Sequence, residues 1–182
     1  MLLPLDRHRH FEAFPDRKQF EEKQPGAVWR GGFHNQLRSE LVDLLGASPD
    51  NDIAAVGGDA GKADYLSPRA QLDRQVILSV EGFDVATNLK WAMGSNSLAM
   101  SPPLKYETWY MEARLKPGHH FVEIKPDFSD LDAATAYYAR HPDKARVIIA
   151  AANAWRAQFD DTQTEDMIAA AVIQKYLQLS QS

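Results

Sequence analysis

The stretch SVEGFDVATNLKWAMGSNSLAM, residues 79–100, decides the fold class. Its apolar start is the end of a strand, residues 81–84 (EGFD) form a glycine turn, and an amphipathic helix is expected over residues 84–93 before a second strand. Strands and helices that alternate in this way are typical of a parallel sheet covered on both faces. Because packing alone does not require the polar residues Glu81 and Asn88, the turn also indicates a binding site.

The same alternation continues on both sides of this stretch. Upstream, AVWRGG (residues 27–32) predicts a strand that ends in a glycine turn, and HNQLRSELVDLLG (residues 34–46) predicts a helix. We therefore expect a Rossmann-like α/β domain over residues 26–182, preceded by an extended arm over residues 1–25 with one short helical piece. The other expected elements are strands at residues 75–80, 97–101 and 119–125, a long loop at 47–68, and helices at 105–112, 129–141, 142–159 and 162–179.

The helical carboxyl terminus carries its own start signals. Ser129 is expected to cap the first of its helices, Pro142 suits the first turn of the second, and Thr162 with Glu165 forms a capping box for the third. The third helix should pack back on the domain through an apolar stripe, which consists of Ile168, Val172, Tyr176 and Leu179.

Composition excludes several classes of protein. Of the 182 residues, 45% are hydrophobic and 25% are charged, which are values of a globular domain. The formal charge of −5 and the lack of a basic stripe argue against a nucleic-acid partner. The chain contains no cysteine, which excludes disulfides, thiolate nucleophiles and cysteine-ligated metals. The start MLLPLDRHRH is too short for a signal-peptide core, so we expect a cytoplasmic protein and leave a peripheral association with the inner membrane open.

Two turns have the composition of a phosphate-binding site. WRGG (residues 29–32) and EGFD (residues 81–84) each follow an expected strand and precede an expected helix. In a parallel α/β sheet, ligands bind beyond the carboxyl ends of the strands, where helix amino termini attract phosphate. If both turns line one cleft, Arg30 and Arg38 supply positive charge to a diphosphate. The alternative, that the glycines only permit tight turns and the arginines are solvated, stays open.

Other motifs carry less information. GGDAGKA (residues 57–63) lacks the spacing and the hydroxyl residue of a Walker phosphate loop, so it is interpreted as an exposed loop. The acidic groups at residues 50–52 and 127–130 suit a turn and a helix start, and no metal site is predicted. His119 and His120 open an expected strand and should therefore face opposite sides, which prevents them from sharing a metal.

Six segments occur in the order of a known family. The chain resembles the glycosyltransferase family that includes the Rumi-type protein O-glucosyltransferases, the fungal capsule-associated proteins and the bacterial lipopolysaccharide-modifying glycosyltransferases, over residues 20–159. The segments that carry the resemblance are Val28-Trp29-Arg30-Gly31, Glu81-Gly82-x-Asp84-Val85-Ala86-x-Asn88-Leu89-Lys90-Trp91, Ser95-Asn96-Ser97, Pro103-x-Lys105-Tyr106-Glu107-Thr108-Trp109, His120-Phe121-Val122 and Asp127-Phe128-Ser129-Asp130-Leu131.

This resemblance implies a GT-B architecture, in which two Rossmann-like halves enclose the active site and the C-terminal half, to which this chain corresponds, holds a UDP-sugar. It places Gly32 and Arg38 at donor-contacting positions and implies no cofactor or metal. The residues expected to contact the UDP moiety are Phe83, Asp84, Val85, Ala86, Thr87 and Asn88. The other expected donor-site residues are Arg30, Gly31, Glu81, Gly82 and Lys90 at the diphosphate, and Tyr106, Glu107 and His120 at the sugar end.

The chain departs from the family pattern at three points. The Rumi-type enzymes have Ser at the position of Gly32 and Arg at the position of Asn88, so phosphate charge must be met here by helix amides, Arg38 or Lys90. The family's proposed catalytic Asp lies in the amino-terminal half, upstream of Trp29. We therefore expect a fragment, a truncated product or a half that works with another polypeptide, and we assign no catalytic base.

The expected function is that of the donor-binding part of a glycosyltransferase, which moves a hexose from a UDP-sugar to a saccharide hydroxyl in lipopolysaccharide or capsule assembly. The expected partners are the UDP-sugar, a saccharide acceptor such as a lipopolysaccharide or capsule precursor, and an N-terminal-half polypeptide or a second copy of the chain. Two alternatives stay open. One is an incomplete half that binds a nucleotide sugar or a partner protein without turnover, and the other is an unrelated α/β binding module.

Overall fold

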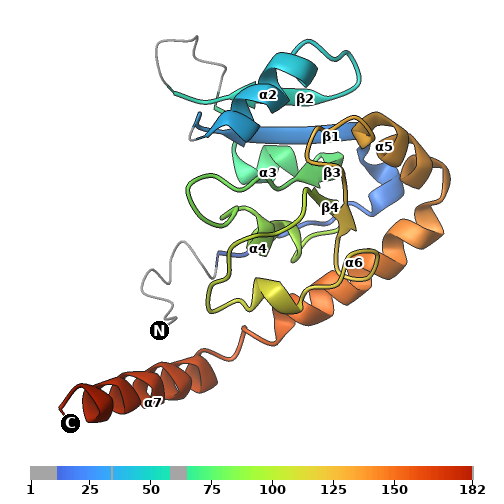
Figure 1. The fold of residues 1–182 in the computed structure, drawn as a ribbon. Helices are drawn as coiled ribbons and strands as arrows, with labels where there is room; N and C mark the ends of the chain where they lie inside the picture. The colour runs from blue at the N-terminus through green and yellow to red at the C-terminus, as the bar shows by residue number, and fades with distance from the viewer. Residues whose placement is uncertain (1–11, 34, 58–64, 182) are drawn as a thin grey trace.

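The computed structural model describes residues 12–33, 35–57 and 65–181 (Figure 1). Within these residues, five parallel strands form a sheet in the order β2-β1-β3-β4-β5. The bounds of the strands are β1 (Gln24–Gly31), β2 (Asp52–Ala55), β3 (Arg74–Leu78), β4 (Leu98–Ser101) and β5 (Val122–Glu123). The predicted class, a Rossmann-like parallel α/β sheet with a helical carboxyl terminus, is confirmed.

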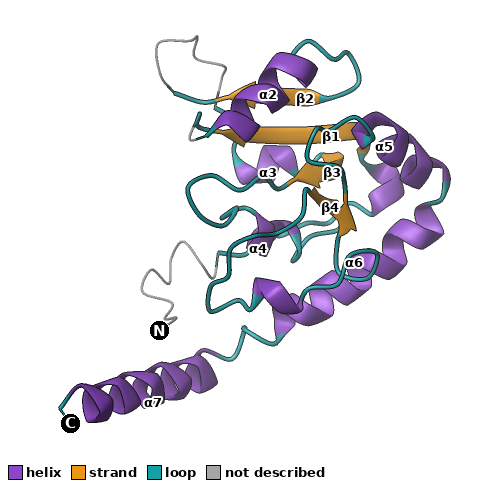
Figure 2. Ribbon diagram, viewed as in Figure 1, coloured by secondary structure: helices purple, strands orange, loops and turns teal. Residues whose placement is uncertain are grey.

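Helices cover both faces of the sheet (Figure 2). Trp29 of β1 is buried on the face covered by α2 (Gln36–Leu45), α5 (Leu131–Arg140) and the start of α6 (Pro142–Ala157). Its neighbour Val28 is buried on the opposite face, under α4 (Leu89–Ala92), the chain around α3 (Pro68–Gln71) and the loop between β4 and β5. Neighbouring residues of a strand point to opposite faces, so β1 is buried from both sides. The other elements are η1 (Phe20–Glu22), η2 (Glu112–Arg114) and α7 (Thr162–Ser180).

The strand order places a topological switch point between β1 and β3. The chain leaves β1 toward β2 on one side and later returns to build β3 and β4 on the other. In open parallel sheets, the connections diverge at such a point and leave a crevice at the carboxyl ends of the two strands. The two glycine turns follow β1 and β3 directly, so both lie at this crevice.

Three expected elements are wrong. The loop expected at residues 47–68 contains β2, a four-residue edge strand flanked by turn residues. The helix expected at residues 84–93 is reduced to α4, and Asp84 does not cap it, because the N-cap position is Asn88 and this residue makes no capping hydrogen bond. Asn88 instead donates from its amide to the carbonyl of Leu78, at 2.9 Å. The helix expected at residues 105–112 is replaced by turns and the short η2.

The capping predictions have mixed outcomes. Pro142 lies in the first turn of α6, as expected. Ser129 does not cap α5, because its hydroxyl donates to Asp127 and the N-cap position is Asp130. The cap of α7 is Asp161, whose carboxylate accepts from the backbone N–H groups of residues 163 and 164. The capping box expected at residues 162–165 therefore starts one residue too late.

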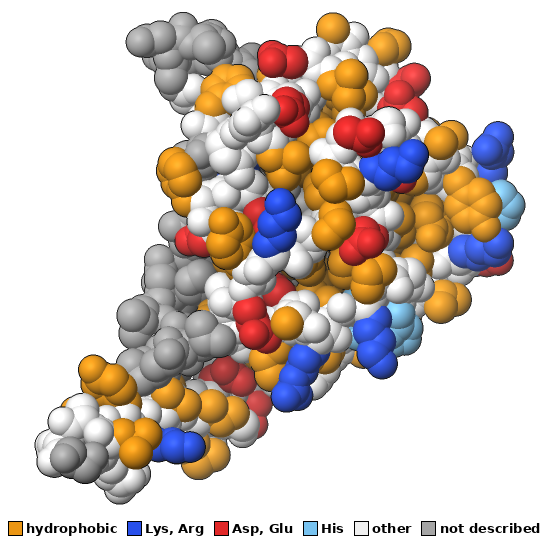
Figure 3. Space-filling model, in the orientation of Figure 1, with side chains coloured by type: hydrophobic (Ala, Val, Ile, Leu, Met, Phe, Trp, Pro, Cys, Tyr) orange, Lys and Arg blue, Asp and Glu red, His pale blue; other side chains and the backbone are white. Residues whose placement is uncertain are grey.

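The prediction that α7 packs back on the domain is wrong. The helix projects from the body of the molecule (Figure 1), and the side chains of Ile168, Tyr176 and Leu179 are 52%, 55% and 69% exposed. In the space-filling view, apolar side chains gather on the surface of this helix (Figure 3). Periodicity identifies an apolar face, but it does not say what covers that face. No helix of the described residues is long and apolar enough to cross a membrane.

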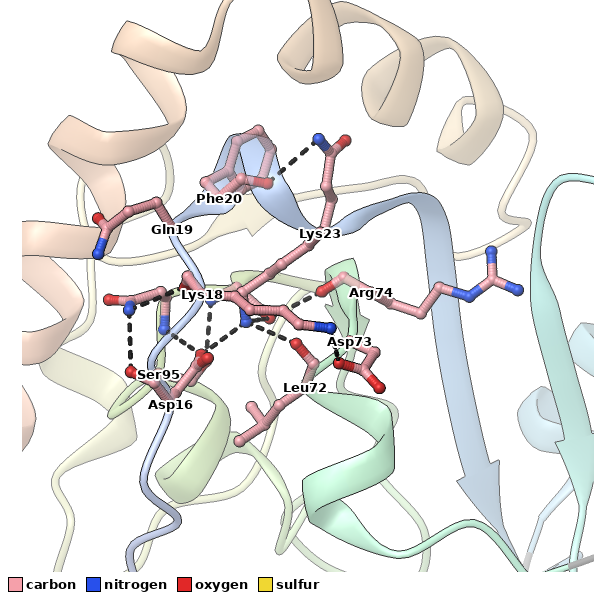
Figure 4. Close-up of polar contacts among 12 residues, drawn as sticks. Asp16, Lys18, Gln19, Phe20, Lys23, Leu72, Asp73, Arg74 and Ser95 are labelled. Atoms are coloured by element: carbon pink, nitrogen blue, oxygen red, sulfur yellow. Dashed lines mark hydrogen bonds and ion pairs between the residues drawn. The ribbon is translucent and has the colours of Figure 1, made fainter.

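The described part of the arm is anchored to the amino ends of the strands. Phe20 is buried in the core, and the Lys23 ammonium lies 2.6 Å from the Asp16 carboxylate. Lys23 also donates to the carbonyl of Leu72 and to the Ser97 hydroxyl, at 2.6 and 2.8 Å. Figure 4 shows how this network ties the arm to the loops before β3 and β4. Residues 12–23 therefore pack on the domain.

Candidate functional site

The turn after β1 leads into α2 through Asn35. The Asn35 side-chain oxygen accepts the backbone N–H of Arg38 at 3.1 Å, which satisfies one free donor in the first turn of the helix. Gly31 lies beside the Trp29 indole, and a Cβ on this residue would come within 2.5 Å of that ring. The buried tryptophan therefore requires glycine at position 31.

The turn after β3 is held directly against the turn after β1. The Asn35 amide donates to the carbonyls of Glu81 and Gly82, at 3.1 and 2.8 Å. Arg38 from α2 donates to the carbonyl of Val80 at 2.7 Å and to that of Gly32 at 3.3 Å. The structure thus brings together the two turns that the sequence singles out.

The Arg38 guanidinium is enclosed by the turns that it joins. Its carbon atom lies 5.6 Å from the centroid of the Trp29 ring, and a Cβ on Gly82 would approach it to 3.1 Å. Burial lowers the pKa of Arg38, and the nearby Asp84 carboxylate opposes this effect. The group stays charged, because the pKa of an arginine lies far above neutral pH. The role of Arg38 at the diphosphate stays a prediction. In the structure its guanidinium is hydrogen-bonded to main-chain carbonyls of both turns.

Glu81 connects the turn after β3 to a third turn, which follows β4. Its buried carboxylate accepts the backbone N–H groups of Lys105 and Tyr106 at 3.1 Å. Tyr106 is 45% exposed and Glu107 is exposed, so both side chains are accessible, and their role at the sugar end stays a prediction. The Glu81 carboxylate itself is directed at the protein backbone.

The segment expected to contact UDP is divided between surface and core. Phe83 is 76% exposed and Asp84 is also exposed. Val85 and Ala86 are buried, whereas Thr87 is half-buried. A ligand at this turn would therefore meet the side chains of the first two residues of the segment.

A cavity of about 390 Å³ lies beside the turn after β1, and Asn88 lines it from the segment that follows β3. Arg30 lines it and pairs with Asp52 of β2 at 2.5 Å, which neutralises part of the charge expected for a diphosphate. The Arg30 Nε is buried and has no hydrogen-bond partner within the described part of the chain. The lining consists of Arg30, Gly31, Gly32, Val56, Tyr65, Leu66, Pro68, Gln71, Asn88 and Trp91.

One predicted donor-site residue is buried with an internal partner. Lys90 is 2% exposed, and its ammonium lies 3.4 Å from the Glu112 carboxylate and near the rings of Trp109 and Tyr110. A buried ammonium with an internal counter-ion is not available to a phosphate, which corrects the assignment of Lys90 to the diphosphate. α4 has four residues, so it also offers no developed helix dipole there.

His120 comes shortly before β5, whose first residue Val122 pairs with Met100 near the end of β4. The His120 ring accepts the backbone N–H of Lys116 at 2.9 Å and contacts the ring of Trp155, with centroids 5.2 Å apart. Burial lowers the pKa of His120, and the neighbouring His119 and Lys116 act in the same direction. The role of His120 at the sugar end stays a prediction.

The weaker motifs have structural partners. Asp52 pairs with Arg30, and Asn51 accepts the backbone N–H of Ala27. His119 and His120 lie in a turn with ring centroids 4.5 Å apart, so the argument from strand alternation is wrong for them. Even so, no group of three His, Asp or Glu residues suited to a metal occurs in the part of the chain that the structure describes. Residues 58–63 of the rejected Walker-like segment lie outside the described residues.

Comparisons with known proteins identify the family of the chain. The chain matches the model of glycosyl transferase family 90 over residues 7–181 and belongs to this family. It is 40% identical to the O-glucosyltransferase LpsA of Dichelobacter nodosus over 183 residues, which cover 98% of the chain and 58% of the relative. It is also 36% identical to the uncharacterized protein 035R of Invertebrate iridescent virus 3 over 76 residues, 41% of the chain and 7% of that protein. The chain thus spans less than two thirds of either relative.

Sequence reasoning missed several residues of the site. Asn35 is an ordinary helix cap by pattern, and nothing local shows that its amide reaches a turn 46 residues away. Tyr65, Gln71 and Trp91 line the cavity from segments that the sequence presents as a loop, an unassigned stretch and a packing helix. A signal for Tyr65 and Trp91 does exist, since large aromatic residues that flank glycine turns at strand ends are candidates for ligand contact.

Proposed function

We propose that this chain forms the donor-binding part of a glycosyltransferase, which transfers a hexose from a UDP-sugar to a saccharide hydroxyl in lipopolysaccharide or capsule assembly. The observation that carries the proposal is the contact of the two glycine turns at the switch point between β1 and β3, with a cavity of about 390 Å³ beside the turn after β1. Membership of glycosyl transferase family 90 supports the reaction class. The relative named an O-glucosyltransferase supports a hexose as the transferred group.

In this proposal the described residues bind the donor and stabilise the departing diphosphate. Transfer of the sugar leaves negative charge on the diphosphate oxygens, and donors already aimed at that charge lower the barrier. Arg38 and Arg30 are the cations at the turns, since Lys90 is buried with Glu112. Removal of the acceptor proton is not assigned to any described residue.

Binding of UDP to the purified chain tests this proposal. At a UDP concentration 100 times the Kd, ligand binding adds about 2.7 kcal/mol to the free energy of unfolding. For a domain of this size, we expect the Tm to rise by about 5–11 °C. The absence of any shift at millimolar UDP would contradict donor binding.

A pair of arginine variants locates the effect. Arg38→Ala should reduce the UDP-induced shift, because it removes a cation and loosens both turns. Arg74→Ala is the matched control, since Arg74 donates to the carbonyls of Pro25 and Asp50 at the amino ends of the strands, at 2.9 and 3.4 Å. This control should keep the full UDP-induced shift. Equal losses in the two variants would place UDP away from the glycine turns.

A further inference from the structure

Asn35 and Glu81 connect the three turns at the carboxyl ends of β1, β3 and β4, together with Arg38, which joins the first two. Asn35, in the turn after β1, donates to two carbonyls of the turn after β3. Glu81, in the turn after β3, accepts two backbone N–H groups of the turn after β4. The three turns are otherwise far apart in the sequence, so these contacts set their relative positions.

The structure assigns Asn35 and Glu81 to a turn clamp, in which they act as positioning residues that hold the three turns in the arrangement that binds the donor. The consequence for the donor rests on the proposed function, whereas the clamp itself rests on the hydrogen bonds alone. Neither residue needs to touch the ligand. Asn35 acts through the carbonyls of Glu81 and Gly82, and Glu81 acts through the backbone at residues 105 and 106.

The amide of Asn35 does more than helix capping requires. A cap needs one acceptor, and Ser or Asp supplies that acceptor about as well as Asn. The Asn35 oxygen performs this task for the Arg38 N–H, while its nitrogen donates to both carbonyls of the neighbouring turn. Only a side chain with both an acceptor and donors can do both, which explains an amide at this position.

The carboxylate of Glu81 is similarly matched to its surroundings. Glu81 is 7% exposed, and a buried carboxylate is costly unless donors are aimed at it. Its two oxygens share the N–H groups of Lys105 and Tyr106, and bonds from N–H groups to an ionised acceptor are stronger than those to a neutral one. The loop after β4 is therefore fixed over the turn after β3, with Tyr106 presented at the surface.

Asn35→Ser separates the clamp from the cap. Serine keeps a neutral capping oxygen but lacks the amide, so α2 should stay capped while the contact with the turn after β3 is lost. The matched control is Asn51→Ser at the opposite edge of the sheet. Asn51 makes the same two kinds of hydrogen bond, since its oxygen accepts the Ala27 N–H at 2.8 Å and its amide donates to Asp132 at 2.7 Å.

Two measurements on the full chain decide the assignment. The first is isothermal titration with UDP at a temperature where all variants are folded. The UDP affinity of Asn35→Ser should be at least about tenfold weaker than that of the parent, a loss of about 1.4 kcal/mol in binding free energy. The affinity of Asn51→Ser should stay within about twofold of the parent. Amide hydrogen exchange should become faster at Lys105 and Tyr106 in Asn35→Ser and in Glu81→Gln, but not in Asn51→Ser. A residue that only caps α2 would not change exchange at these two distant amides.

The outcomes separate the clamp from the proposed function. If the parent chain does not bind UDP, the proposed function fails, and hydrogen exchange at Lys105 and Tyr106 still decides the clamp. If exchange at these amides is the same in the parent and in Asn35→Ser, the clamp is refuted. Unchanged UDP affinity in Asn35→Ser, together with faster exchange, would refute the positioning role in donor binding.

Discussion

Replacing Lys23 by methionine tests the buried ion pair between Lys23 and Asp16. The Lys23 side chain has no exposed surface, the Asp16 side chain is 6% exposed, and the two charges are 2.6 Å apart. Burial lowers the pKa of Lys23, and the hydrogen bond and charge of Asp16 oppose this effect. Lys23→Met keeps the length of the side chain but leaves the Asp16 carboxylate buried with the Asn96 N–H as a remaining donor.

The magnitude follows from the burial of both partners. Removal of one partner of a buried ion pair costs about 3–5 kcal/mol, because the other charge stays desolvated. For a domain of this size, the Tm should fall by about 6–20 °C. Lys18→Met is the matched control, because Lys18 pairs with Asp73 at 2.5 Å but the two side chains are 53% and 52% exposed. An exposed pair contributes about 0–1 kcal/mol, so this control should lose at most about 4 °C.

Thermal unfolding followed by circular dichroism measures both variants. The double variant Lys23→Met/Asp16→Leu should recover much of the loss, since replacing both charges removes the uncompensated carboxylate. If Lys23→Met unfolds within 2 °C of Lys18→Met, roughly the spread of surface substitutions, the reasoning from burial is refuted.

Two further predictions concern His120 and α7. The folded pKa of His120 lies below its ordinary value, so the unfolded chain binds more protons as the pH falls below about 6.5. The free energy of unfolding should therefore decrease with falling pH from that point, and this decrease should be smaller in His120→Gln. Urea titrations at several pH values measure it. An identical pH dependence of the free energy in both proteins would contradict the prediction. Deleting residues 162–182 should change the Tm of the remaining body by less than about 2 °C, because α7 is largely exposed. A fall of more than about 5 °C in calorimetry would show that α7 supports the body.

The sheet was predictable because its signals are local. Apolar runs such as Arg74–Leu78 and Leu98–Ser101 stand between clear turn residues, and their alternation with helices points to a parallel sheet. β2 was missed because its four residues, Asp52–Ala55, are as short as a turn and contain two alanines. Its assignment depends on pairing with β1, which a local pattern does not reveal.

The site was predictable in location but only partly in its residue roles. The turns after β1 and β3 could be found from glycine at strand ends, and parallel topology then brings them to one edge. The burial of Lys90 could not be found in this way. Whether a lysine reaches solvent or a buried glutamate depends on tertiary packing.

Hydrogen exchange of the full chain with and without UDP tests the central claim most directly. The claim predicts slower exchange at residues 31–38 and 80–88, on both sides of the switch point, and unchanged exchange at the amino ends of the strands. The amino ends offer an internal comparison, because a cavity of similar size, about 400 Å³, lies there between Gly26, Asp50 and Asp132. Protection confined to that cavity, or no protection at saturating UDP, would contradict donor binding at the glycine turns.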